Sequence, residues 1–241
     1  MLIALAQTVS RDLDVEANVD RHVRAVATAA AAGARVVLFP ELSLTGYLPA
    51  AVAGDASLVL TPADPRLLPL REECRRRAVT AVVGAPTACD RERHLSAVVV
   101  DGRGAVGLYD KRNLFGAERA AFTPGRGAHV LDVDGRRLAL GVCADLGDDA
   151  QAVEAGGADA WLLGVLLSPQ GYRADADRAA EVARRYRVPV VLANHAGPTG
   201  GWAGAGGSGS WWPGGEAVVA GPGPGVFLVD LDDPSPVLQV G

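Results

Sequence analysis

The chain has 241 residues, of which 49% are hydrophobic and 21% are charged, and its formal net charge is -5 at pH 7. A chain of this length and hydrophobicity can bury one large core, so we expect residues 1–241 to form a single domain. The acidic balance and the lack of a basic block argue against a nucleic acid or an anionic membrane as partner, and they favour a small molecule.

The first half of the chain alternates short apolar strands with amphipathic helices. Segment 1–6 is apolar, but it lacks the cationic start and the small-residue cleavage site of a secretion signal. No run approaches the ~20 apolar residues of a membrane span. Helices are predicted over 15–32, where Gly33 ends the pattern, and from Pro65 to about residue 78. Strands are predicted over 3–6, 35–39, 81–84, 94–100 and 105–109, the last two as a hairpin.

The second half continues the alternation. A hairpin over 129–133 and 136–142 is followed by a short helix that opens at about Ala150, a strand over 159–165, a helix over 174–186 and a strand over 188–193. Closing strands are predicted over 208–212, 217–220 and 226–231. The pattern indicates an α/β fold with mixed sheets covered by helices. Segment 204–209 matches GxGxxG, but no helix follows it, so we reject a dinucleotide site.

Cys143 stands directly after the apolar strand 138–142 and before a turn at 147–149. A side chain on such a strand-to-helix corner is held up for attack, and the neighbouring backbone N–H groups point at its target. The alternative is a free cysteine that packs as a small hydrophobe. Cys74 is most simply a core residue, and Cys89 lies in a polar loop over 88–93 without an obvious partner. The spacings indicate neither disulfides nor zinc, so we expect no metal, no cofactor and a reducing cytoplasm.

Two further residues have the chemistry that would support such a nucleophile. Of the 23 basic residues, Lys111 is the single lysine, and a compact ammonium is something that arginine cannot supply. Glu41 follows Phe39-Pro40 at a strand exit, where burial would raise its pKa toward the range useful for proton transfer. The alternative for Glu41 is a solvated loop residue.

Segment 111–125 is too apolar for a free loop and too broken for a helix, so we expect it to pack over the site. Glu118 lies within it and could brace Lys111. The alternative is a surface ion pair with Arg119 or Arg126, which would contribute little.

Three separated motifs carry a resemblance. They are Phe-Pro-Glu-Leu-Ser-Leu-Thr-Gly-Tyr over 39–47, Tyr-Asp-Lys-Arg-Asn-Leu over 109–114 and Gly-Val-Cys-Ala-Asp over 141–145. In this order they resemble the signature set of the nitrilase superfamily, the carbon–nitrogen hydrolases. The resemblance extends from Ile3 to about Leu231 and implies an α-β-β-α sandwich that commonly pairs into homodimers.

The resemblance also implies roles for the residues already singled out. Glu41, Lys111 and Cys143 would form the catalytic triad, with Glu118 as a frequent fourth member. Cys143, deprotonated by Glu41, would attack an amide-type carbon, while Lys111 and the backbone N–H of Ala144 hold the oxyanion. Release of ammonia or an amine would leave a thioester, which water activated by Glu41 hydrolyses. An aliphatic amide, an ω-amide, an N-carbamoyl compound and a nitrile all remain open as substrates, and we favour an amide.

The sequence departs from the family pattern in three places. The segment after Cys143, 146–154, is about two residues shorter than in many members, which bears on any contact with a substrate carboxylate made there. Asn113 replaces a common histidine, and the C-terminus is short, which bears on the dimer.

Two other readings of the same residues remain open. One is a catalytically silent domain that binds a small ligand or a partner protein through the same pocket. The other is a thiol redox protein built on Cys143. That function would require a resolving cysteine, or a low-pKa thiol without a neighbouring carboxylate base. Trp202, Trp211 and Trp212 either line the pocket entrance or serve in packing.

Overall fold

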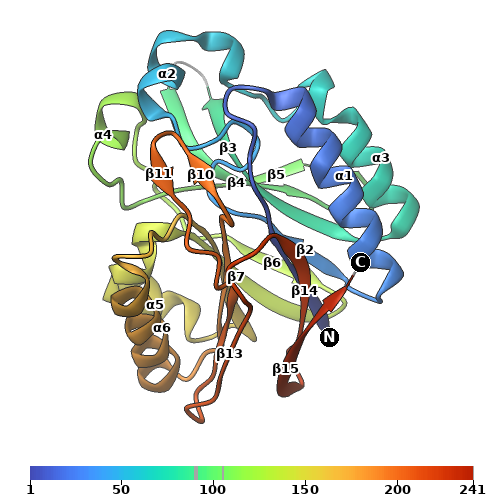
Figure 1. Ribbon diagram of the computed structural model, residues 1–241, viewed down its shortest axis with the longest axis vertical. Helices are drawn as coiled ribbons and strands as arrows, with labels where there is room; N and C mark the ends of the chain where they lie inside the picture. Colours follow the sequence, from blue (N-terminus) through green and yellow to red (C-terminus); the bar gives the residue numbers. More distant parts are fainter. Residues whose placement is uncertain (90–91, 105, 241) are drawn as a thin grey trace.

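The computed structural model describes residues 1–89, 92–104 and 106–240 and contains two large sheets (Figure 1). The first has the strand order β15 (Asp233–Val240), β14 (Gly225–Asp230), β1 (Leu2–Gln7), β2 (Val36–Leu38), β3 (Thr80–Cys89), β4 (Glu92–Val100), β5 (Val106–Asp110). The second has the order β13 (Ala217–Val219), β12 (Gly209–Trp211), β9 (Val190–Asn194), β8 (Ala160–Val165), β7 (Arg136–Val142), β6 (Val130–Val133).

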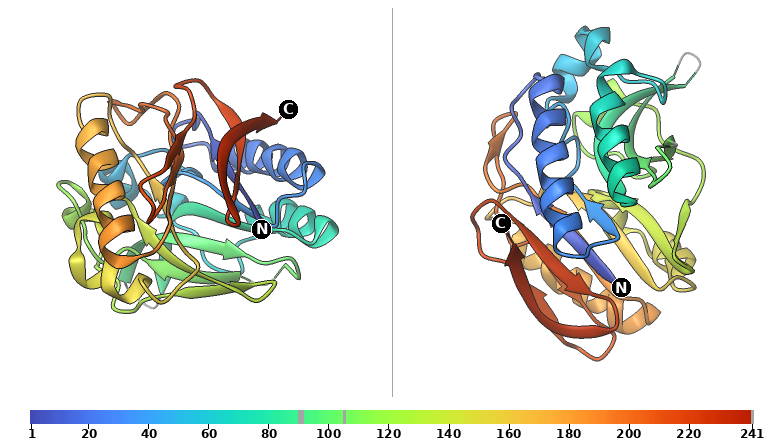
Figure 2. Two further views of the ribbon diagram at one scale, coloured as in Figure 1. Left: turned by 90° about the horizontal axis from the view of Figure 1, so that it is seen from below. Right: turned by 90° about the vertical axis from the view of Figure 1, so that its right-hand side faces the viewer.

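Helices cover the outer face of each sheet. Helices α1 (Val15–Ala31) and α3 (Leu68–Arg77) lie on the first sheet, and α5 (Asp149–Ala155) and α6 (Tyr172–Tyr186) lie on the second, so that four layers are visible in Figures 1 and 2. Shorter elements connect them: α2 (Pro49–Gly54), α4 (Glu118–Ala121), the 3-10 helices Ala56–Leu58, Pro65–Leu67 and Cys143–Gly147, and the small hairpin of β10 (Pro198–Thr199) and β11 (Trp202–Ala203). The α-β-β-α sandwich is therefore confirmed.

The alternation of side chains along each strand explains the layers. On β1, Ile3 and Leu5 enter the core between the two sheets, whereas Ala4 and Ala6 face helix α1. The small alanines let the helix approach, and the larger residues fill the space between the sheets. The same division holds on β7, where Leu138 and Leu140 point between the sheets.

Strand direction brings the candidate residues to one edge. Strands β1, β2 and β3 are parallel, and β5 has the direction of β3 because both are antiparallel to β4. In the second sheet, β7, β8 and β9 are parallel. Loops that leave the carboxyl ends of such strands converge on one crevice, and Glu41, Lys111 and Cys143 all follow such ends.

The structure corrects several sequence predictions. Strand β3 runs to Cys89, which pairs with Glu92, so Cys89 belongs to a long exposed strand end and not to a polar loop. The helix predicted from Pro65 starts as a 3-10 turn before α3. Strand β15 and helix α2 were not predicted, and Ala105, the first residue of a predicted strand, lies outside the described residues. Among the described residues, no helix is long and apolar enough to cross a membrane.

Candidate active site

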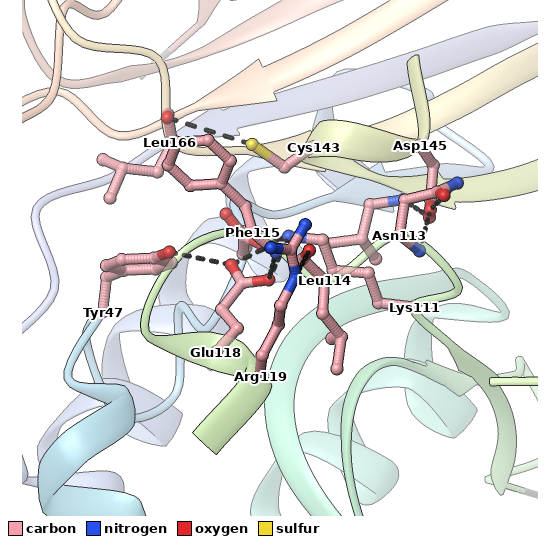
Figure 3. Close-up of polar contacts among 12 residues, drawn as sticks. Tyr47, Lys111, Asn113, Leu114, Phe115, Glu118, Arg119, Cys143, Asp145 and Leu166 are labelled. Atoms are coloured by element: carbon pink, nitrogen blue, oxygen red, sulfur yellow. Dashed lines mark hydrogen bonds and ion pairs between the residues drawn. The ribbon is translucent and has the colours of Figure 1, made fainter. Parts of the chain in front are cut away.

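Cys143 stands at the junction of β7 and the 3-10 helix Cys143–Gly147, with φ at 45°. This left-handed conformation is costly for a residue with a side chain, and such strain is typical of nucleophiles on sharp strand-to-helix turns. The thiol lines a cavity of about 290 Å³, and its sulfur lies 4.0 Å from the carbonyl oxygen of Leu166 (Figure 3). Burial and the charge of Glu41 raise the pKa of the Cys143 thiol well above its usual value. The resting group is therefore a thiol that needs a base.

Glu41 lies beside the thiol in the same cavity and is 1% exposed. Its Oε1 accepts a hydrogen bond from Lys111 Nζ at 2.6 Å, and its Oε2 has no hydrogen-bond partner in the described part of the chain. Burial raises the pKa of Glu41 to about 7, although the Lys111 charge acts in the opposite direction. A free carboxylate oxygen with this pKa can accept and return a proton near neutral pH.

Lys111 is completely buried between two carboxylates. Its Nζ donates to Glu41 and, at 2.8 Å, to Glu118. Burial by itself would lower the pKa of Lys111, but the nearby carboxylates outweigh it and hold the pKa above its ordinary value. The side chain is thus a fixed ammonium behind Glu41 and Glu118, which line the cavity.

Glu118 holds that ammonium in place (Figure 3). Its carboxylate, 1% exposed, also accepts hydrogen bonds from the hydroxyl of Tyr47 and the backbone N–H of Phe115, both at 2.8 Å. The alternative of a surface ion pair with Arg119 or Arg126 is therefore wrong. Segment 111–125 packs over the site as expected, with α4 as its single helical turn.

Asp145 orders the turn that carries Cys143. Its buried carboxylate accepts hydrogen bonds from the backbone N–H groups of Val142 and Asn113 at 2.9 Å, from Tyr109 Oη at 2.8 Å and from Gln151 Nε2 at 3.0 Å. It therefore joins the loop after β5 to the loop after β7. Asp145 lies within the third sequence motif, but no local pattern predicts its role.

His195 contacts the backbone of Glu41. Burial lowers the pKa of His195 to about 4, so the ring is neutral, and Nε2 donates to the backbone carbonyl of Glu41 at 2.7 Å. The strand predicted over 188–193 ends two residues before His195, but nothing local connects this histidine with a glutamate 154 residues away.

Two glycines let the Glu41 turn pass between the sheets. A Cβ on Gly84 of β3 would lie 2.2 Å from the backbone nitrogen of Leu42, and one on Gly164 of β8 would lie 2.5 Å from the carbonyl oxygen of Phe39. A side chain at either position would push the turn out of place.

The three tryptophans divide between the two roles left open. Trp202, on β11, is 46% exposed, lines the cavity and meets Tyr47 edge to face at 6.2 Å. Trp211 and Trp212 are buried packing residues. Among the described residues, no group of three or more His, Cys, Asp or Glu could hold a metal ion.

Known proteins resemble this chain in sequence and in fold. Residues 2–235 match the carbon-nitrogen hydrolase family. An (R)-stereoselective amidase from a Pseudomonas species is 31% identical over 150 residues, which cover 61% of this chain and 52% of the amidase. A glutamine-dependent NAD(+) synthetase from Thermotoga maritima is 28% identical over 148 residues, 60% of this chain and 25% of the synthetase. The match thus spans about half and a quarter of the length of these curated relatives.

Solved structures of an amidase from Nesterenkonia sp. AN1 are similar over nearly the whole chain. One is 32% identical with a TM-score of 0.87, covering 97% of this chain and 96% of that one. A cysteine-to-alanine variant of that amidase holds butyramide, with 32% identity, a TM-score of 0.87 and coverage of 95% and 90%. A glutamate-to-glutamine variant carries the acetamide moiety of fluoroacetamide on its active-site cysteine, with 33% identity, a TM-score of 0.88 and coverage of 95% and 89%.

Proposed function

Because the chain belongs to the carbon-nitrogen hydrolase family, we propose that it hydrolyses the carbon–nitrogen bond of a small amide through a thioester on Cys143. One observation carries the proposal: a buried ammonium, Lys111, lies 2.6 Å from a buried carboxylate, Glu41, in the wall of the cavity that holds the thiol. This arrangement supplies a nucleophile, a base and an electrophilic group at one place. An amide is favoured over a carbamoyl compound or a nitrile because the solved relatives are amidases.

The first half of the reaction forms the thioester. The free Oε2 of Glu41 takes the thiol proton as the sulfur attacks the amide carbon. The carbonyl oxygen becomes an oxyanion, which Lys111 Nζ stabilises. The backbone N–H of Ala144 adds a second donor, because the first N–H groups of a helix have no partner within it, and Ala144 follows directly after the first residue of the 3-10 helix.

The second half regenerates the enzyme. The protonated Glu41 gives its proton to the leaving nitrogen, so ammonia departs and the acyl group stays on sulfur. Water then enters, Glu41 takes one of its protons, and the hydroxide attacks the thioester carbon. The acid leaves and the thiol recovers its proton. Glu118 acts through Lys111, which it keeps charged and oriented, with Tyr47 completing its hydrogen bonds.

An ammonia-release assay with acetamide and butyramide tests the proposal. Wild type should release ammonia, and a reaction quenched with acid should show the acyl adduct on the peptide that contains Cys143. Cys143→Ala should abolish both signals, whereas the matched control Cys89→Ala, at an exposed cysteine outside the cavity, should retain them. Binding of amides without ammonia release would instead support the catalytically silent domain.

We further propose that residues 1–241 act as one domain. The core between the sheets takes residues from β1, β2, β7 and β8 alike, so the two sheets share one interior along their facing sides. The homodimer and the cytoplasmic location remain predictions, and light scattering on the purified chain would measure the oligomeric state.

A further inference from the structure

The cavity contains one carboxylate that the proposed reaction does not use. Asp175, in the first turn of α6, lines the cavity with Cys143 and Glu41. Its side chain makes no hydrogen bond or ion pair with any residue that the structure describes. It is partly buried, and loss of water raises the pKa of its carboxyl. An unpaired carboxylate in a partly dehydrated cavity requires a reason.

The other charges that line this cavity are compensated within the protein. The carboxylates of Glu41 and Glu118 both accept hydrogen bonds from the buried Lys111 ammonium. The Arg178 guanidinium donates to Asp149 at 2.5 Å and to Glu181 and the carbonyl of Leu146, both at 3.1 Å. Arg178 is therefore not a free cation for a substrate carboxylate, and the uncompensated charge at the cavity is negative.

The position of Asp175 on α6 favours the ionised form of its carboxyl. The N-terminal turn of a helix carries partial positive charge, which favours the carboxylate over the carboxylic acid. The same effect allows a purely structural role, in which Asp175 only stabilises the helix. The two roles differ in one respect: a structural carboxylate would not distinguish substrates by charge.

We propose that Asp175 binds a cationic group, a primary ammonium above all, at the end of the substrate's acyl chain that is remote from the scissile amide. The inference rests on the proposed function, since it assigns the substrate class of the same site: primary amides of ω-amino acids. The methylene chain of such a substrate would contact apolar and aromatic lining residues, among them Leu146, Leu167, Tyr47 and Trp202. A terminal carboxylate would meet an unpaired anion and be rejected.

The test compares three amides of similar length: hexanamide, 6-aminohexanamide and the monoamide of adipic acid. Ammonia release should give a kcat/KM for 6-aminohexanamide about tenfold or more above that for hexanamide, as expected for one charge-assisted hydrogen bond. The carboxylate amide should be the poorest. Asp175→Asn should remove the preference, and Asp175→Lys should shift it toward the carboxylate. The matched control is Asp177→Asn, because Asp177 is an exposed residue of the same helix outside the cavity and should leave the preference unchanged.

Failure of the inference is distinguishable from failure of the proposed function. Equal kcat/KM values for the three amides, or a preference that survives in Asp175→Asn, would overturn the role of Asp175 and leave amide hydrolysis intact. A lowered melting temperature with an unchanged preference would assign Asp175 to helix stability alone. If no amide releases ammonia, the binding of the amides to Cys143→Ala, measured by calorimetry, still tests the role of Asp175. Tighter binding of 6-aminohexanamide than of hexanamide, lost when Asp175→Asn is added, supports the inference. Equal binding of the two amides overturns it.

Discussion

Replacement of Lys111 by methionine separates two roles of one ammonium. The side chain is completely buried, and its loss would leave Glu41 and Glu118 without their shared cation. Breaking a buried ion pair on one side typically costs ~3–5 kcal/mol. Because the entropy of unfolding scales with chain length, that loss corresponds to a melting temperature lower by about 6–10 °C for 241 residues. Loss of an oxyanion donor should lower kcat by about a hundredfold or more.

A second substitution tells the two losses apart. In Lys111→Met combined with Glu118→Gln, one of the two unpaired carboxylates is gone, so the melting temperature should recover in part. The catalytic rate should not recover, since the donor to the oxyanion is still missing. Thermal unfolding followed by circular dichroism and ammonia release from butyramide measure the two quantities. Recovery of the rate together with stability, or near-normal turnover in Lys111→Met, would refute the proposed role.

Three further predictions concern the base, the nucleophile and the turn that carries it. Burial raises the pKa of Glu41 to about 7. Because Glu41 must be ionised to act as a base, kcat/KM should fall as the pH drops through that value, and a pH–rate profile measures this fall. Glu41→Gln should slow alkylation of Cys143 by iodoacetamide, read by peptide mass, while Cys89 reacts at an unchanged rate; equal slowing of both would contradict the pairing. Both carboxylate oxygens of Asp145 accept hydrogen bonds, one from Val142 N–H and the other from Asn113 N–H, so Asp145→Asn must set an NH2 group against one of these donors. The change should cost ~1–3 kcal/mol of stability and lower kcat. Unchanged denaturant melts and kinetics would show that Asp145 does not support the site.

Local sequence patterns predicted most of the strands and helices correctly. Alternation along 3–6 and 136–142, turn signals such as Asp134-Gly135 and a glycine after the first helix are all properties of neighbouring residues. The family motifs then placed Glu41, Lys111 and Cys143 together, and the geometry agrees. Their catalytic roles remain the subject of the experiments above.

The residues that escaped prediction owe their positions to distant parts of the chain. His195 contacts the Glu41 backbone across 154 residues, and β15 is a strand only because it pairs with β14. Asp175 looks like an ordinary residue of a helical first turn until the cavity is seen. From the sequence, Glu118 had two possible roles, a brace for Lys111 or a partner in a surface ion pair. The choice depends on whether the short connecting segment is buried, and that depends on what packs above it.

The passage of the Glu41 turn between Gly84 and Gly164 ties the Glu41 carboxylate to both layers of the sandwich at once. Gly84 belongs to the first sheet and Gly164 to the second. Any slippage of one sheet over the other would therefore displace Glu41, even with every side chain of the site chemically intact. With Glu41 as the proposed base, the rate of turnover therefore depends on how the two sheets are aligned. On gradual heating, activity should fade no later than the packing between the layers.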